Sequence, residues 1–497
     1  MNKTTHLSGR LLVVAVAILV VAYVLLLIPE ASPTLPDPEP KEPFAWRMDA
    51  YFDVLEAEYV RVRELGCDSV RAQLLTRLDH VERQVRALDE QDVPADHAVW
   101  LELETALFEL APRTAVCYEL LPRYQRLFNC IRRMAKRQSR EWDMDDPPVR
   151  HRLYRLLYGG RAALEEVLLQ VPDSCVTALD VANPEPCATP SAELLGTTIH
   201  SGDLLVSRGG APTSALIARG NDFPGNFSHV ALAHVDSAGD VSIIEAHIEC
   251  GVKVATLDDY LRDKKLRVMV LRLRRDLPVI EYDSLFADMA ADLALQRARD
   301  GHTAYDFAMD FDDNSTLFCS EVASAPYKDL GLRLWMGLSH ISRPGTREWL
   351  GAFGVRNFTT QAPSDLEYDP QLTVVAEWRD PETLFQDHVD NAVIDVLLDE
   401  ADNGLELDYE WYKLPVARLM KAYSSLVNQF GGVGPVPEGM SATSALRNNW
   451  FSKQHAAIKG RLLEKAKEFE MTRGYRPPYW ELISMAQEVV GEQLGTS

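Results

Sequence analysis

The sequence has few basic residues for its length. Its 497 residues include 51 Lys and Arg against 74 Asp and Glu, and the formal net charge is -23 at pH 7. Nucleic acids and anionic lipid surfaces attract proteins with the opposite balance. The composition therefore argues against nucleic acid as a partner and against docking on an anionic lipid surface.

Two motifs that would indicate other chemistry are incomplete. His247-Ile248-Glu249 matches the H-x-E half of a zinc deaminase, but no P-C-x-x-C follows it. Gly431-Gly432-Val433-Gly434 is rich in glycine but lacks the Lys-Ser/Thr of a phosphate-binding loop. A convincing repeat of fixed period is also lacking, which argues against a solenoid. We predict neither a metal site nor a cofactor.

An unbroken apolar run of 18 residues occupies positions 11–28. At about 1.5 Å rise per residue it just spans the hydrocarbon core of a bilayer. Lys3 and Arg10 precede the run and acidic residues follow it, so the positive-inside rule puts residues 1–10 in the cytoplasm. We predict a single-pass anchor in the inner membrane, with the rest of the chain in the periplasm. The rival interpretation is a cleaved signal peptide, although a small-x-small cleavage site is not evident after Ile28.

The length suggests about three domains after the anchor. Residues 29–45 are rich in proline and are predicted to form an extended spacer that lifts the body off the membrane. Residues 46–170 are predicted to be a helical bundle, and residues 171–195, with four prolines and two cysteines, a linker. Residues 196–378 are predicted to form an α+β domain, and residues 379–497 are predicted to be helical again.

The bundle prediction depends on apolar spacing. Leu74, Leu78, Val81, Val85 and Leu88 alternate steps of four and three, which is typical of helices packed at small angles. Such stripes also permit a homo-oligomer through the helical domains. Asp96 is a candidate cap for one of the helices.

Between 196 and 378 the apolar segments become short and β-branched. Residues 237–240, Ser-Ala-Gly-Asp, are predicted to form a hairpin turn. The fold class expected is α+β, a small antiparallel sheet with helices on one side. The strands are expected near 203–206, 230–234, 241–245 and 268–273, and the helices near 282–299 and 319–328.

The seven cysteines of an exported chain favour disulfides. If Cys319 stays free, six remain and 15 pairings are open. Cys175 and Cys187 flank a Pro-containing loop and are the best local candidates. The alternative is that several of the six are buried apolar thiols.

Cys319 follows a run of turn and capping residues, 312–316, and precedes a helical stretch. The first turn of a helix favours a thiolate through the helix dipole, and its free N–H groups can hold an oxyanion. Taken alone, a buried structural cysteine explains the residue equally well.

His229 is expected at the start of one strand, and Glu245 at the end of the paired strand. A histidine at a strand end can take a thiol proton and later protonate the leaving group. Glu245 lies in an apolar stretch and needs a partner, which the second nitrogen of His229 can supply. The alternatives are a structural histidine and a salt bridge from Glu245 to an arginine such as Arg272. Tyr305 either lines the cleft or packs as an aromatic residue.

Taken in order, five short motifs resemble a known family. They are similar to the circularly permuted branch of the NlpC-type papain-like superfamily, the YiiX/YaeF-like thiol hydrolases. The resemblance implies a permuted papain-like core with Cys319 as nucleophile, His229 as base and Glu245 as the orienting residue. The motifs are Gly202-Asp203, Ser228-His229-Val230, Glu245-Ala246, Tyr305-Asp306 and Cys319-Ser320-Glu321, and residues 364–378 resemble a closing strand.

We therefore expect a membrane-anchored thiol hydrolase that cleaves an amide bond outside the cytoplasm, with cell-wall peptide as the first candidate substrate. Tyr305 and Asp203 are assigned to substrate binding. One alternative is acyl hydrolysis or transfer on a lipid, such as a lipid amide, with Phe223, Phe227 and Phe307 as its apolar wall. The other is a non-catalytic membrane-anchored scaffold with an inactive papain-like module.

Overall fold

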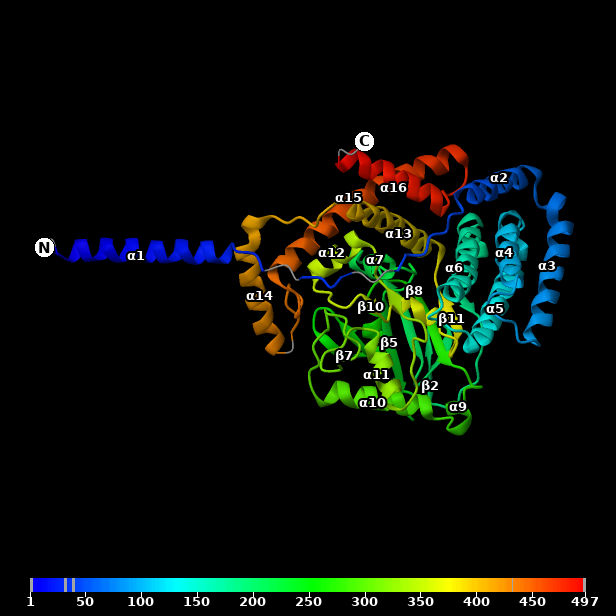
Figure 1. The fold of residues 1–497 in the computed structure, drawn as a ribbon, viewed down its shortest axis with the longest axis horizontal. Coiled ribbons are helices and arrows are strands. Elements are labelled where there is room, and N and C mark those ends of the chain that lie inside the picture. Colours follow the sequence, from blue (N-terminus) through cyan, green and yellow to red (C-terminus); the bar gives the residue numbers. More distant parts are fainter. Residues whose placement is uncertain (1–2, 31–33, 38–40, 431, 495–497) are drawn as a thin grey trace.

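The computed structural model describes residues 3–30, 34–37, 41–430 and 432–494, with side chains described from Val14 onward. Figure 1 shows a broad body from which one helix, α1 (Lys3–Leu26), projects alone. Among the residues described, no helix is both long enough and apolar enough to cross a membrane. The side chains of residues 11–13, part of the predicted anchor, lie outside the described ones. From Val14 to Leu25 the large apolar side chains of α1 are 50–68% exposed.

The Pro-rich segment is not a free spacer where it is described. The Pro36 carbonyl accepts a hydrogen bond from Arg347 at 2.6 Å, and the Phe44 N–H donates to the Asp222 carbonyl at 2.9 Å. Leu35 packs among the helices of the C-terminal region. Apolar and backbone contacts therefore bind residues 34–37 and 41–45 to the body, and the lift of the body off a membrane stays a prediction.

The predicted helical bundle is present. Its stripe residues, Leu74 to Leu88, are buried in α3 and share one core with the neighbouring helices. The expected cap at Asp96 is wrong, since α4 starts at Val99 and no side chain caps it. The bundle helices are α2 (Asp49–Leu65), α3 (Cys67–Asp89), α4 (Val99–Val116), α5 (Leu121–Gln138) and α6 (Pro147–Gln170).

An antiparallel sheet of seven strands occupies the middle of the described chain, in the order β1-β11-β8-β4-β5-β6-β7. The turn predicted at 237–240 joins β5 and β6. The sheet is larger than predicted because β7 was not expected and because the segment interpreted as a linker supplies β1, which pairs with β11. The strands are β1 (Leu179–Val181), β4 (Leu204–Gly209), β5 (His229–Val235), β6 (Val241–His247), β7 (Gly251–Thr256), β8 (Lys265–Leu273) and β11 (Leu372–Trp378).

Alternate residues of the strands point to opposite faces of the sheet, and both faces are covered. On one face, Leu204, Val230 and Ile244 pack with α10 and α11. On the other, Leu205 and Ala231 pack with shorter elements. The expectation of helices on one side alone is therefore too simple. The covering elements are α9 (Pro278–Tyr282), α10 (Phe286–Asp300) and α11 (Glu321–Asp329), and β2 (Ser191–Leu194), β3 (Thr197–His200) and α8 (Leu257–Arg262).

The C-terminal region is helical, as predicted, and packs on the body through α13, which contacts α6, α7 and β8. Residues 431–439 separate α14 from α15, and residue 431 lies outside the described residues. The helices are α7 (Pro212–Arg219), α12 (Pro344–Phe353), α13 (Pro381–Asp402), α14 (Leu414–Gln429), α15 (Ala442–Arg473) and α16 (Tyr479–Leu494); β9 (Ser339–His340) and β10 (Thr359–Thr360) form a short ladder.

A buried ionic network joins the bundle, the sheet and α13. Arg161 on α6 donates to Glu377 on β11 at 2.5 Å and to Glu367 at 2.5 Å. Arg267 on β8 donates to Glu165 on α6 at 2.5 Å and pairs with Asp387 on α13 at 2.6 Å. These side chains are nearly inaccessible to solvent, so removing one partner would leave an uncompensated charge in the core. The helical flanks are therefore built onto the sheet and are not loose appendages.

The disulfide prediction is wrong in its pairing. Cys67 at the start of α3 bonds to Cys117 at the end of α4. Cys175 and Cys187 are free thiols, as are Cys130, Cys250 and Cys319.

Candidate active site

Cys319 lies two residues before the start of α11 at Glu321, whereas the sequence predicted it in the first turn of that helix. Its side chain is 4% exposed, and its thiol lies 3.9 Å from the Ser228 carbonyl, the residue before β5. Burial raises the pKa of this thiol to about 11, against backbone N–H groups, including that of Val230, that lower it. The expectation that the helix terminus favours the thiolate is therefore wrong for this structure, because desolvation is the larger effect.

His229 and Glu245 meet on the sheet, as predicted. Ala231 pairs with Glu245 across β5 and β6, and His229 lies two residues from Ala231, so its side chain is on the same face. Glu245 Oε2 accepts a hydrogen bond from His229 Nε2 at 2.9 Å. Burial lowers the pKa of His229, and its bond to Glu245 partly offsets that shift. The alternative pairing of Glu245 with Arg272 does not occur.

A second histidine, His247, flanks Glu245. Its Nε2 lies 2.9 Å from Glu245 Oε1. Glu245 is 1% exposed; burial would raise its pKa, but the contacts with both histidines outweigh this and hold the pKa well below its usual range. In the sequence, His247 stands out only as part of an incomplete zinc-deaminase motif. Its position, two residues from Glu245 on the same strand face, is the signal that would have found it.

The three side chains His229, Glu245 and His247 bring their ligand atoms within 4.8 Å of one another. Two imidazoles and a carboxylate are a donor set that suits Zn²⁺. The structure therefore contains a group able to hold a metal ion, where the sequence predicted none.

Cys319 and His229 are neighbours without a direct bond. The Cys319 thiol approaches the backbone on both sides of His229, at Ser228 and Val230. Within the described residues, no hydrogen bond joins the thiol to the imidazole. Catalytic hydrogen bonds are often long or misaligned in enzymes without substrate. The carboxylate–histidine half of the predicted site is thus assembled, and the thiol lies beside it in its neutral form.

Tyr305 is close enough to Cys319 for a charge on the thiol to change the pKa of the Tyr305 hydroxyl. Burial raises the pKa of Tyr305 well above its usual value, and a thiolate at Cys319 would raise it further. The Tyr305 and Phe307 rings meet edge to face, 5.0 Å apart. Tyr305 thus lies near Cys319 and also packs against the core of the sheet, so the structure supports both interpretations of this residue.

Glu321, the last residue of the Cys319-Ser320-Glu321 motif, has no role assigned to it from the sequence. Its Oε2 accepts a hydrogen bond from the Phe318 N–H at 2.9 Å, which closes the turn that carries Cys319. Burial raises the pKa of Glu321 to about 8, helped by the charges of nearby aspartates. The side chain is therefore mainly neutral at pH 7 and keeps a negative charge away from the thiol.

The Asp203 carboxylate is fully occupied by partners within the protein. Both of its oxygens accept hydrogen bonds from Arg272, each at 2.8 Å, and one also accepts from the His200 N–H at 2.8 Å. With its side chain 1% exposed, no oxygen is left for a substrate. We therefore replace the substrate-binding assignment of Asp203 with a structural one: it fixes the turn between β3 and β4.

The apolar wall proposed for a lipid substrate is largely absent. Phe227 is fully buried under the Arg161 and Arg267 guanidinium groups, and Phe223 packs in the core of the bundle. Of the three phenylalanines, Phe307 alone packs on the Tyr305 ring. A cavity of about 790 Å³ lies elsewhere, between the bundle and α16, and none of Cys319, His229 and Glu245 lines it.

A cysteine at a helix start, beside a strand-borne histidine that is held by a carboxylate, is the arrangement of the papain-like hydrolases, here with the histidine before the cysteine. Residues 198–376 match the family model described as permuted papain-like amidase enzyme, YaeF/YiiX, C92 family. The match ends within β11 and leaves out the helical flanks. No curated protein and no solved structure matches the chain.

This result confirms the resemblance stated from the sequence, the fold class and the enzyme class. The family consists of amide-bond hydrolases, in agreement with a cysteine hydrolase.

Proposed function

We propose that this protein is an amidase or peptidase that cleaves an amide bond through Cys319, His229 and Glu245. The hydrogen bond between His229 Nε2 and Glu245 Oε2 carries the proposal. A carboxylate only accepts, so Nε2 must carry the proton and Nδ1 keeps its lone pair. Glu245 thereby makes the imidazole a base at the nitrogen that is free to face a thiol.

In the proposed reaction, His229 Nδ1 takes the proton of Cys319 as Sγ attacks the carbonyl carbon of the amide. Backbone N–H groups at the start of α11 are placed to stabilise the oxyanion. The tetrahedral intermediate expels the amine, which takes its proton from His229, and a thioester remains on Cys319. Water, deprotonated by His229, then attacks the thioester, releases the acid and restores the thiol.

The neutral resting thiol fits this order of events. With a pKa of about 11, Cys319 is not a preformed thiolate at pH 7. Its ionisation then depends on proton transfer to His229 when substrate occupies the cleft. We propose that Tyr305 lines the acyl side of that cleft.

We further propose that the segment 11–28 anchors the chain in the inner membrane, that the catalytic domain faces the periplasm, and that cell-wall peptide is the substrate. Support comes from the apolar run, from Lys3 and Arg10 before it, and from the exposure of the α1 side chains described.

Isotope-labelled cell-wall fragments and phospholipid vesicles, offered to the full chain, divide the two substrate classes. We expect new amino groups from the wall fragments, and none with Cys319→Ala. Fatty-acid release from vesicles with intact wall fragments would instead assign the site to lipid. Equal, background release by wild type and Cys319→Ala from both substrates and from a broad acyl-peptide panel would favour the non-catalytic scaffold.

A further inference from the structure

The helix α14 carries an apolar face that is exposed to solvent, in addition to the face that packs on the body. Leu414, Pro415, Ala417 and Ser424 are buried against the body. On the opposite side of the helix, apolar residues recur every three to four positions, and their side chains are 40–64% exposed. Exposed aromatic residues continue this face beyond both ends of the helix. These side chains are Trp411, Val416, Leu419, Met420, Tyr423, Leu426 and Phe430.

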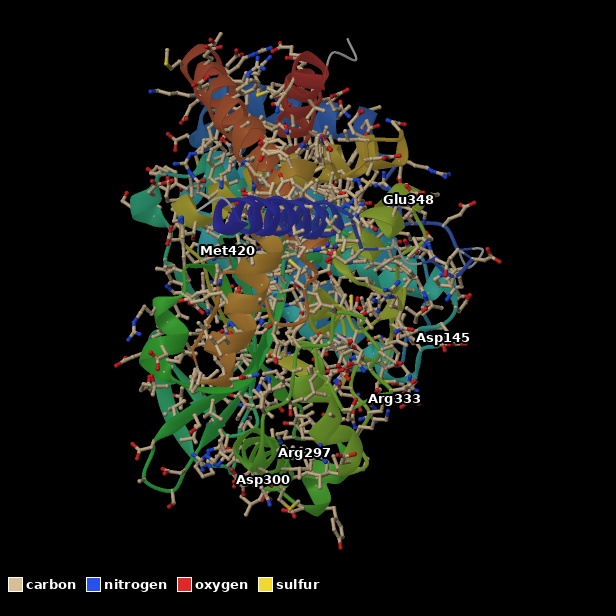
Figure 2. All side chains as sticks on the ribbon, turned by 90° about the vertical axis from the view of Figure 1, so that its left-hand side faces the viewer. Asp145, Arg297, Asp300, Arg333, Glu348 and Met420 are labelled. Atoms are coloured by element: carbon tan, nitrogen blue, oxygen red, sulfur yellow. A yellow bond between two sulfur atoms is a disulfide. The ribbon has the colours of Figure 1, made fainter. Side chains whose placement is uncertain are left out.

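The apolar face lies at the root of α1. Arg418 on α14 donates to the Leu25 carbonyl at 3.1 Å and to that of Ile28, and pairs with Glu30 at 3.5 Å. In Figure 1, α1 leaves the body beside α14, and α14 lies across its base. Figure 2, which looks at the body from the side that carries α1, shows α14 running across this side with Met420 on it.

The charge of α14 departs from that of the chain as a whole. Its 16 residues contain Arg418 and Lys421 and no carboxylate, whereas the whole chain has a net charge of -23. Both basic side chains are bonded within the protein, Arg418 to α1 and Lys421 to the Met440 carbonyl. An amphipathic helix that has no carboxylate and has aromatic residues at its ends suits the boundary between headgroups and acyl chains. The overall acidity therefore does not exclude lipid contact at this one face.

We infer that α14 docks flat on the bilayer, with Leu419, Tyr423 and Leu426 in the headgroup–acyl boundary, while α1 enters the same bilayer. The inference rests on the anchoring proposed above. A single lipid surface accounts for the exposed apolar side chains of both α1 and α14. The helix α14 lies across the base of α1, so it can lie along the membrane surface while α1 enters the membrane.

Docking at α14 also fixes the distance between the candidate active site and the bilayer. Gly439, in the segment after α14, packs so closely on the Phe307 ring that a Cβ at this position would lie 2.5 Å from it. Glu438 pairs with His302 at 2.9 Å. Both contacts are made to the loop that carries Tyr305. Docking of α14 on the membrane therefore fixes the distance between this loop, which precedes Cys319, and the lipid surface.

The test uses the full chain in nanodiscs of phosphatidylethanolamine and phosphatidylglycerol, with a carbene-generating reagent that partitions into the acyl region. Labelled peptides are mapped by mass spectrometry. We expect label on α1 and on 411–430. Tyr282 is 94% exposed and lies on α9, far from α1 in Figure 1, and is expected to stay unlabelled.

A triple variant, Leu419→Asp, Tyr423→Asp and Leu426→Asp, is expected to lower the label on 411–430 at least fivefold and to keep the label on α1. Label on α1 without label on 411–430 in the wild type would overturn the docking and leave the anchor intact. Label on 411–430 without label on α1 would support the docking and refute the anchor. Protection of 411–430 together with two copies per nanodisc would overturn the docking in favour of a dimer contact.

Discussion

The resting Cys319 thiol is predicted to react slowly with a small alkylating agent. Burial raises its pKa from about 9 to about 11, so the thiolate fraction at pH 7 falls about 100-fold. A more basic thiolate is the better nucleophile. With a Brønsted coefficient of ~0.45, two pKa units raise the reactivity of the thiolate roughly 8-fold. The net expectation is alkylation about tenfold slower than that of an ordinary thiol, before the steric effect of burial.

Iodoacetamide labelling of the full chain, followed by peptide mass spectrometry, measures this rate. Cys175 is exposed and free and serves as a reference within the same sample. Labelling of Cys319 is expected to lag that of Cys175 at pH 7 and to rise about tenfold per pH unit up to pH 10. Labelling of Cys319 as fast as Cys175 at pH 7, or a plateau below pH 9, would mean a preformed thiolate and would refute the reasoning.

Three further predictions concern the site and its support. Glu245→Gln removes the charge that fixes the imidazole tautomer, and kcat is expected to fall roughly 10²- to 10⁴-fold with little change in KM. Arg161→Met leaves buried carboxylates without their partner, and urea denaturation is expected to show a loss of about 3–5 kcal/mol in the free energy of unfolding. Replacing Cys67 and Cys117 by Ala opens a link across a sequence separation of 50, and the chain-entropy model gives a loss of about 4 kcal/mol.

Matched controls exist for the first two changes. Asp292 on α10 accepts a hydrogen bond from His234 at 2.9 Å on the surface, so Asp292→Asn removes a similar pair away from the site and is expected to leave kcat unchanged. Arg126 is exposed on α5, and Arg126→Met is expected to change stability by less than about 0.5 kcal/mol. An equal effect of each test variant and its control would contradict the roles given to Glu245 and Arg161. For the disulfide, unfolding curves that are the same with and without reductant would contradict its contribution.

The residues that the sequence placed correctly follow local rules. The two-residue period of a strand puts His229 and Glu245 on one face, and a single hairpin turn sets their register. The start of α11 could be expected from the capping residues before Cys319. Each inference needs only the chain within about 20 residues.

The inferences that failed depend on partners far away in the sequence. Asp203 looked available for a substrate because Arg272, which holds it, lies on β8. The segment 171–195 looked like a linker because β11, the partner of β1, comes almost 200 residues later. The thiol pKa depends on burial, which the residues next to Cys319 do not determine. None of these contacts leaves a periodic pattern in the local sequence.

The central claim is that Cys319 forms a covalent acyl intermediate through the base His229. Its most direct test is mass spectrometry of the chain quenched during turnover of any amide that the wild-type protein cleaves. We predict that the acyl group adds its mass to the peptide containing Cys319 and is removed by hydroxylamine, and that cleavage is lost in Cys319→Ala and in His229→Ala. Undiminished release of the amine by Cys319→Ala would contradict the account.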